Sequence, residues 1–329
     1  MKTFKNSELK TFEQLAMLKQ SSLKKVLASF LKKHYKKVVH TDKYIFVEGD
    51  IPIALVAHMD TVFKDSPEEV FFDPVKNVLW SPDGLGADDR AGVFAIVQII
   101  RAGYRPHVIF TTDEEIGGVG ASELAKLDCP FKDLRYIIEL DRRGSNDCVF
   151  YDCENPKFID YVEDFGFEYN FGSYTDICEF CPTWKIAGVN LSIGYRDEHS
   201  VSEVLFVGQM LSTIEKVKKM LDKAKEAPTF EYIPSKKAYS WAYGIDWYNL
   251  TKQSFGSGVS KCYGCKKHFI DEELFPIVLL DKTTSYLCPD CVVDKAAWCR
   301  VCGNAFQKHS PEAPVDGLCP FCEEVGVKE

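Results

Sequence analysis

The chain has 329 residues, 46% of them apolar, and a net charge of −9. This composition indicates a globular protein with one sizeable core and room for a smaller module. The negative charge argues against capture of nucleic acid or anionic membranes, and no apolar run is long enough to span a bilayer. Because the first residues also lack the apolar stretch of a secretory signal, we expect a cytoplasmic protein.

Helical and strand-like patterns alternate along the first two thirds of the chain. Residues 7–38 have the apolar spacing of a helix with a lysine-rich outer face. The predicted strands that follow cover residues 44–47, 53–57, 107–112, 136–140 and 189–194, and the predicted helices cover 89–102, 121–127 and 201–225. This order predicts an α/β domain over residues 1–225, with a mixed, largely parallel sheet flanked by helices.

Residues 226–260 differ in composition from the domain before them. They contain two prolines and close with Gly256-Ser257-Gly258, and between these lie the aromatic residues Tyr239, Trp241, Tyr243, Trp247 and Tyr248. We interpret the stretch as a connector whose aromatic side chains pack on a neighbouring domain. A cysteine-rich module follows over residues 261–325.

Side chains that bind metals follow several of the predicted strands. They are His58, Asp60, Asp88, Glu114, Glu115, Asp141 and His199. Buried charges at strand ends are costly unless they are neutralised or ligated. The carboxyl ends of parallel strands meet at one edge of a sheet, and oxygen and imidazole ligands suit zinc. Three carboxylates and one hydroxide would balance the charge of two zinc ions, so the sequence predicts a dimetal site.

The order of these residues carries a resemblance to a known superfamily. The sequence reads H-x-D from residue 58, G-A-D-D-R-A-G from 86, D-E-E-I-G-G from 113, an aspartate at 141 and H-S-x-x-E from 199. This series resembles the co-catalytic dizinc exopeptidases, which include peptidase T, the tetrahedral aminopeptidases and the secreted bacterial leucine aminopeptidases. The resemblance covers roughly residues 50–220 and includes Thr175-Asp176 before the last predicted strand.

The resemblance implies a ligand set for two zinc ions or other divalent metals. His58 and Asp141 would hold one metal, and Glu115 and His199 would hold the other. Asp88 would bridge the two. The residues beside His199 leave an alternative open, because Asp197 or Glu198 could be the ligand in its place.

The resemblance also implies the residues that act on the substrate. Glu114 would be the general base that takes a proton from a metal-bridged water, and Asp60 would accept a hydrogen bond from His58 and fix its tautomer. An aspartate at position 141 resembles the aminopeptidases of the superfamily. Only 57 residues separate Asp141 from His199, too few for the lid domain of peptidase T, so the chain resembles the lidless aminopeptidases.

Two nearby features are expected to have structural roles. Asp89 is interpreted as a residue that supports the site rather than a ligand. Arg142 and Arg143, directly after Asp141, could meet a substrate carboxylate, but a surface salt bridge is the favoured interpretation.

Eight of the 13 cysteines form four C-x-x-C pairs: Cys262/Cys265, Cys288/Cys291, Cys299/Cys302 and Cys319/Cys322. In a reducing compartment such clustering indicates structural zinc rather than disulfides, with two pairs to each tetrahedral site. A repeated Leu-Cys-Pro-x-Cys favours two sequential zinc ribbons, and an interleaved arrangement remains open. One knuckle resembles that of rubredoxin, but the loop is shorter, so we expect zinc rather than iron.

The charge of this module bears on its partner. From residue 259 onward there are eight Lys and Arg against eleven Asp and Glu. Phosphate binding needs clustered positive charge, so we expect no nucleic acid and favour a protein partner or a cap over the active-site mouth. A fifth pair, Cys178 and Cys181, is interpreted as core.

The leading interpretation is a dizinc metallopeptidase, an aminopeptidase-like hydrolase of peptide substrates with two structural zinc ions in its tandem zinc-ribbon module. An amidohydrolase that deacylates N-acyl amino acids is one alternative. A catalytically silent binding protein that recruits a partner through the ribbons is another, and the presence of Glu114 beside every expected ligand argues against it.

Overall fold

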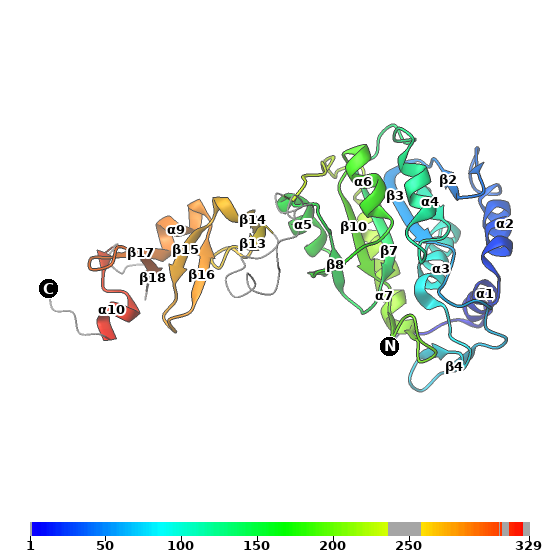
Figure 1. Cartoon of the computed structure of the whole chain (residues 1–329), viewed down its shortest axis with the longest axis horizontal. Helices are drawn as coiled ribbons and strands as arrows, with labels where there is room; N and C mark the ends of the chain where they lie inside the picture. The colour runs from blue at the N-terminus through cyan, green and yellow to red at the C-terminus, as the bar shows by residue number, and fades with distance from the viewer. Residues whose placement is uncertain (1, 236–257, 309, 311–315, 325–329) are drawn as a thin grey trace. The chain divides into compact units, whose positions relative to one another are not determined.

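The structure is a computed structural model, and it describes residues 2–235, 258–308, 310 and 316–324. The chain divides into two compact units, Met1–Cys153 with Tyr161–Ile233 and Glu154–Asp160 with Pro234–Glu329 (Figure 1). Within the described residues, no helix has the length and apolar character needed to cross a membrane.

The first unit is built on a mixed sheet, as the sequence predicted. Among the described residues the strand order is β1-β2-β6-β3-β7-β10-β8-β9. The central strands β6, β3, β7 and β10 run parallel, whereas β1, β2 and β8 join by antiparallel pairing. The bounds are β1 Val39–His40, β2 Tyr44–Val47, β3 Ile51–His58, β6 Pro106–Thr111, β7 Tyr136–Arg142, β8 Asp147–Val149, β9 Glu168–Tyr169 and β10 Gly188–Ser192.

Helices flank this sheet. Helix α3 packs against β3 and β7, and α1 and α7 pack on α3. Helices α4 and α6 pack on each other and enclose a core cluster in which Val56, Ile109, Leu124 and Phe180 are fully buried. The bounds are α1 Asn6–Ala16, α2 Gln20–Leu31, α3 Ala87–Arg101, α4 Val119–Ala125, α5 Pro156–Glu163, α6 Ile177–Trp184 and α7 Val207–Asp222.

The prediction of one helix over residues 7–38 is wrong. Two helices, α1 and α2, occupy this stretch, and they are separated at residues 17–19. Both carry apolar residues that are buried, including Phe12 on α1 and Leu27 on α2. In a single straight helix, the buried residues of both segments would lie along one axis. The break lets each helix turn its own apolar face toward the core.

The predicted helix over residues 201–225 is correct only over Val207–Asp222. Residues Val204–Phe206 form strand β12, in which Leu205 pairs with Leu79 of β5. The apolar residues of this stretch fit a helical spacing, but strand pairing buries Leu205 completely. The strand belongs to a smaller sheet of order β11-β12-β5-β4, with bounds β4 Phe71–Asp73, β5 Val78–Trp80, β11 Tyr195–Arg196 and β12 Val204–Phe206.

The first part of the predicted connector packs on the first unit. The Phe230 amide donates to the Arg135 carbonyl at 2.9 Å, and the ring of Phe230 lies 5.9 Å from that of Tyr136. The chain leaves this unit after Ile233, rather than at residue 225. The aromatic residues from Tyr239 to Tyr248 lie outside the described residues.

The second unit contains short strands and two small apolar clusters. Strands β13 and β14 pair with each other, and the remaining described strands form a sheet of order β16-β15-β18-β17-β19. One cluster includes Cys262, Leu287 and Cys288, and the other includes Cys299 and Cys319. The bounds are β13 Val259–Lys261, β14 His268–Ile270, η2 Asp271–Glu273, β15 Phe275–Val278, β16 Thr284–Leu287, α9 Pro289–Lys295, β17 Ala296–Cys299, β18 Ala305–Gln307, β19 Asp316–Gly317 and α10 Pro320–Glu324.

Candidate active site

The predicted ligands of the first unit lie at one edge of the main sheet. His58 ends β3, Glu114 and Glu115 follow β6, and Asp141 lies near the end of β7. These three strands are parallel neighbours, so their carboxyl ends meet. Asp88 joins them from the first turn of α3.

Two imidazoles face the two oxygens of Asp88. His58 Nε2 lies 3.0 Å from Asp88 Oδ1 and 3.5 Å from Asp141 Oδ1. His199 Nε2 lies 3.2 Å from Asp88 Oδ2 and 3.1 Å from Glu115 Oε2. Each set of three side chains has ligand atoms within 4.8 Å of one another. The geometry therefore offers two adjacent metal positions that share Asp88.

The alternative ligands beside His199 have other contacts. Glu198 Oε1 lies 2.9 Å from Arg143 Nη1, and the Asp197 carbonyl accepts a hydrogen bond from the Ser200 hydroxyl. The His199 backbone has a φ of 63°, the left-handed conformation. The side chain of His199 reaches Asp88 and Glu115, the contacts that the resemblance implied for it.

Asp60 connects His58 to the turn that carries Glu114 and Glu115. Its Oδ1 atom lies 3.3 Å from His58 Nδ1. Its two carboxylate oxygens accept hydrogen bonds from the backbone amides of Glu114 and Glu115, at 3.0 and 3.1 Å. Burial raises the pKa of Asp60, but His58 and these amides outweigh burial and lower it. Asp60 is therefore an anion that supports both neighbours.

Asp141 is held by side chains to which the sequence assigned no role. Tyr195 donates to Asp141 Oδ1 at 3.0 Å, and the Thr175 hydroxyl donates to Oδ2 at 2.9 Å. Asn190 bonds the backbone of Asp141 in both directions. Asn190 lies on β10, the strand next to β7, and Tyr195 begins β11 three residues after β10 ends, so their place around the end of this neighbouring strand was the available signal.

Glu203 holds the backbone on which Asp88 sits. Its carboxylate accepts the amides of Ala87 and Asp88, each at 3.0 Å, and the residue is 1% exposed. The sequence contained Glu203 in the H-S-x-x-E motif but assigned it no role. Asp88 and Asp89 have non-helical backbone angles, so these amides precede the regular turns of α3, and Glu203 fixes the segment that presents Asp88.

Close packing brings α3 against the strand that carries Asp141. A Cβ atom on Gly92 would lie 2.3 Å from the Leu140 carbonyl oxygen, so only glycine fits at this crossing. Asp89, which is fully buried, accepts the Gly92 amide at 2.8 Å. Asp89 thus supports the start of α3, as the sequence indicated.

The acidic side chains of the site repel one another when no cation is present. Burial raises the pKa of Glu114 to about 8, that of Glu115 to about 7 and that of Asp141 to about 6, and neighbouring carboxylates add to each shift. The hydrogen bond to Asp88 raises the pKa of His199 to about 9. Glu115 Oε1 is buried and has no hydrogen-bond partner among the described residues. Both observations fit a site built to hold divalent cations.

The two arginines after Asp141 are both engaged in ion pairs. Arg143 contacts Glu198, as described above. Arg142 Nη2 lies 3.5 Å from Asp147 Oδ2 and donates to the Phe171 carbonyl at 2.9 Å. These contacts agree with the favoured interpretation of salt bridges.

The cysteine pairs of the second unit gather into two groups of four. One group is Cys262, Cys265, Cys288 and Cys291, and the other is Cys299, Cys302, Cys319 and Cys322. This is the sequential arrangement. Burial raises the pKa of Cys262 and Cys299, but backbone amides outweigh it and lower both to about 6. The groups are able to bind metal, because thiolate is the form that binds zinc.

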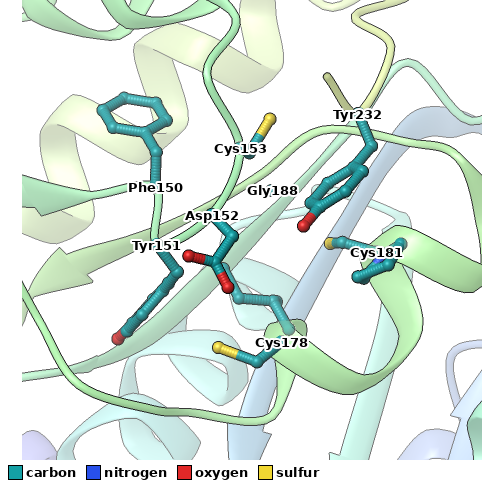
Figure 2. A pocket seen from close by; sticks show the side chains of 10 residues that line it. Phe150, Tyr151, Asp152, Cys153, Cys178, Cys181, Gly188 and Tyr232 are labelled. Atoms are coloured by element: carbon teal, nitrogen blue, oxygen red, sulfur yellow. The ribbon is translucent and has the colours of Figure 1, made fainter. Parts of the chain in front are cut away.

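Cys178 and Cys181 lie in the body of the first unit. They line a small cavity of about 60 Å³ together with Cys153, Tyr151 and Tyr232 (Figure 2). Burial raises the pKa of both thiols. Cys181 is buried and Cys178 is half-buried, and neutral thiols in such places agree with their interpretation as core residues.

Comparison with known proteins gives a likeness of fold. No family model and no curated protein matches the chain. The likeness is to solved structures of peptidases, and at identities this low it establishes the fold alone. Over about two thirds of its length the chain shares the fold of aminopeptidase and tripeptidase structures, as the order of its motifs predicted.

Three of these structures match over nearly their whole length. A tripeptidase from Staphylococcus aureus has a TM-score of 0.54 at 13% identity, with 67% of this chain and 98% of that chain covered. Aminopeptidase PepT from Bacillus cereus has a TM-score of 0.53 at 14% identity, with 66% of this chain and 98% of that chain covered. An aminopeptidase from the archaeon Desulfurococcus kamchatkensis has a TM-score of 0.52 at 14% identity, with 66% of this chain and 95% of that chain covered.

Proposed function

We propose that the chain is a metal-dependent peptidase, an aminopeptidase that works with two divalent cations at the edge of the main sheet. The observation that carries this proposal is the position of Asp88 between two imidazoles, each accompanied by a further carboxylate. The fold shared with the three peptidases supports it.

The side chains divide into two cation sites. His58 and Asp141 would hold one cation, Glu115 and His199 the second, and Asp88 both. Cations bound in this way lower the pKa of water and polarise a carbonyl group. The hydrogen bonds described above would keep these ligands in place. They come from Asp60, Thr175, Tyr195 and Glu203.

Glu114 is the proposed general base. One of its oxygens lies within 4.8 Å of ligand atoms of His58 and Glu115, so it faces the cation sites. Its carboxylate would take a proton from the attacking water and pass it to the amine that leaves. The pKa of about 8 to which burial raises Glu114 is that of the metal-free site, and two bound cations would favour its carboxylate, the form that accepts a proton.

The finer parts of the proposal rest on single features. Asp141, rather than a glutamate, supports an aminopeptidase over a deacylase, through the resemblance described for the sequence. The two groups of four cysteines support two structural zinc ions. The acidic character of the second unit supports a protein partner for it rather than nucleic acid.

The test combines metal analysis with hydrolysis of an aminoacyl amide by the wild type and by Glu114→Gln. We expect about four bound metals in both proteins, two in each unit. The kcat of Glu114→Gln should fall by about 10²–10⁴-fold, the usual contribution of a general base. Glu123→Gln is the matched control, because Glu123 is an exposed carboxylate on α4 that pairs with Lys126.

Each other outcome has a definite meaning. Unchanged turnover by Glu114→Gln would remove the proposed base. Turnover of N-acyl amino acids but not of free-amine substrates would make the chain a deacylase. Full metal content without turnover of either substrate would favour the silent binding protein.

A further inference from the structure

The junction between α1 and α2 contacts both segments that carry the proposed ligands. The carbonyl of Leu18 accepts a hydrogen bond from Arg90 Nη2 at 2.9 Å, and Arg90 lies two residues after Asp88. Gln20, the first residue of α2, bonds to Asp113, which directly precedes Glu114. No role in the site was assigned to this junction from the sequence.

Gln20 uses both ends of its amide on Asp113. Its Nε2 atom donates to Asp113 Oδ1 at 2.9 Å, and its Oε1 atom accepts the Asp113 backbone amide at 3.2 Å. The second oxygen of Asp113 lies 3.2 Å from Lys43 Nζ. Asp113 has a φ of 60°, so its backbone is in the left-handed conformation, which aspartate adopts less readily than glycine. Gln20 thus holds both the side chain and the backbone of Asp113.

The turn after Asp113 is held from its other side by Asp60. Asp60 accepts the amides of Glu114 and Glu115, and within the turn the amides of Gly117 and Gly118 bond to the Glu114 carbonyl at 2.9 Å. The position of Glu114 and Glu115 therefore depends on the bonds within the turn, on Asp60, and on the contacts that Gln20 and Lys43 make with Asp113.

We propose that Gln20 is a positioning residue for the active site. Through Asp113 it fixes the turn of residues 113–118, which carries the proposed base Glu114 and the proposed ligand Glu115. Gln20 acts only through this turn, and its effect on turnover rests on the proposed function. Misplacement of a catalytic group by about 1 Å can cost about 10²-fold in rate, so a small shift of this turn has a measurable effect.

The test replaces the amide and keeps the size of the side chain. Gln20→Leu removes both bonds to Asp113, and Ser21→Leu, at an exposed position one residue further along α2, is the matched control. We expect Gln20→Leu to lower kcat by about tenfold while KM for the aminoacyl amide and the metal content stay unchanged. Amide hydrogen exchange over residues 111–119 should be faster in Gln20→Leu and unchanged in Ser21→Leu.

A double-mutant cycle shows whether Gln20 acts through Asp113. In an Asp113→Ala background, Gln20→Leu should lower kcat by less than it does in the wild type, because its bond to the Asp113 side chain is already gone and only its bond to the backbone amide remains to be lost. Asp113→Asn still accepts the bond from Gln20 and should lose less activity than Asp113→Ala. A full additional loss in the Asp113→Ala background would overturn the proposal.

The exchange measurement separates this proposal from the proposed function. If the wild type hydrolyses no peptide, the proposed function fails and the exchange rates still decide whether Gln20 holds the turn. Unchanged exchange in Gln20→Leu overturns the proposal, and so does faster exchange with unchanged kcat in an active enzyme. A loss of kcat by Ser21→Leu equal to that of Gln20→Leu would also overturn it.

Discussion

The two units build their candidate metal sites in different ways. In the first unit the ligands run from His58 to His199, and parallel strands bring them together. In the second unit each group of four cysteines comes from a short stretch, residues 262–291 or 299–322. One site is a product of long-range topology and the other is a product of local spacing.

The two units also differ in the apolar core that stabilises each of them. The first unit has a large apolar core, including Phe94, Phe110 and Phe180, that contains none of the ligands. The two apolar clusters of the second unit are small and contain the cysteines themselves. Metal would therefore complete a preformed site in the first unit, whereas in the second it would be part of the core.

The largest expected effect is the loss of a cysteine group. Cys288 is buried within the first cluster of the second unit, so Cys288→Ser should release one metal and unfold residues 259–295, which carry the first cysteine group. Structural zinc binding is worth on the order of 10 kcal/mol in small domains, more than such a core can supply. Metal analysis and hydrogen exchange would measure both changes.

The same variant tests the independence of the first unit. Turnover of an aminoacyl amide should be unchanged in Cys288→Ser, because the first unit has its own core. Cys129→Ser, a cysteine outside both groups, is the control and should lose no metal. If Cys288→Ser kept all its metal but lost turnover, the two units would not be independent, and the difference described above between them would be contradicted.

An intermediate effect is expected from pH. Because the pKa values of Glu114, Glu115 and Asp141 are raised in the folded protein, the metal-free folded state binds more protons than the unfolded state between about pH 4 and pH 8. Their contribution to stability is full below pH 4 and is lost as the pH rises through 6 to 8. Metal needs deprotonated ligands, so its contribution grows over the same range.

Thermal denaturation of the full chain, with zinc and with a chelator, would measure this pH effect. We expect the difference in Tm between the two conditions to be larger at pH 8 than at pH 5.5. The chelated protein should itself be less stable at pH 8. A chelated protein that gains stability toward pH 8 would contradict a preformed acidic site.

The smallest expected effect concerns Arg143. Its side chain is 65% exposed and pairs with Glu198, so Arg143→Ala should change the free energy of unfolding by about 0–1 kcal/mol. KM should change equally for an aminoacyl amide and for a peptide with a free carboxylate. A selective rise in KM for the peptide would instead place Arg143 at the substrate carboxylate.

Much of the fold could be predicted because its signals are local. The strand over residues 44–47 agrees with β2, and the strand over 107–112 agrees with β6 to within a residue. Such strands are continuous apolar runs that end at turns. The break between α1 and α2 and the strand β12 were missed, because both depend on partners far away in the sequence, as Leu205 depends on Leu79.

The chemistry that each unit can perform is already present in the amino-acid sequence. The sequence specified which side chains could bind metal, their order in the first unit and the spacing of the cysteine pairs in the second. These are properties of residue type and local spacing, and they need no knowledge of distant contacts.

The contacts between these side chains, in contrast, depend on the tertiary structure. It brought Asp88 between His58 and His199, directed Glu198 to Arg143 and joined the cysteine pairs in sequential order. It also brought Gln20 into hydrogen-bond contact with Asp113, which lies 93 residues further along the chain. Contacts of this kind follow from strand register and helix packing, which depend on the whole core and not on the residues beside each ligand.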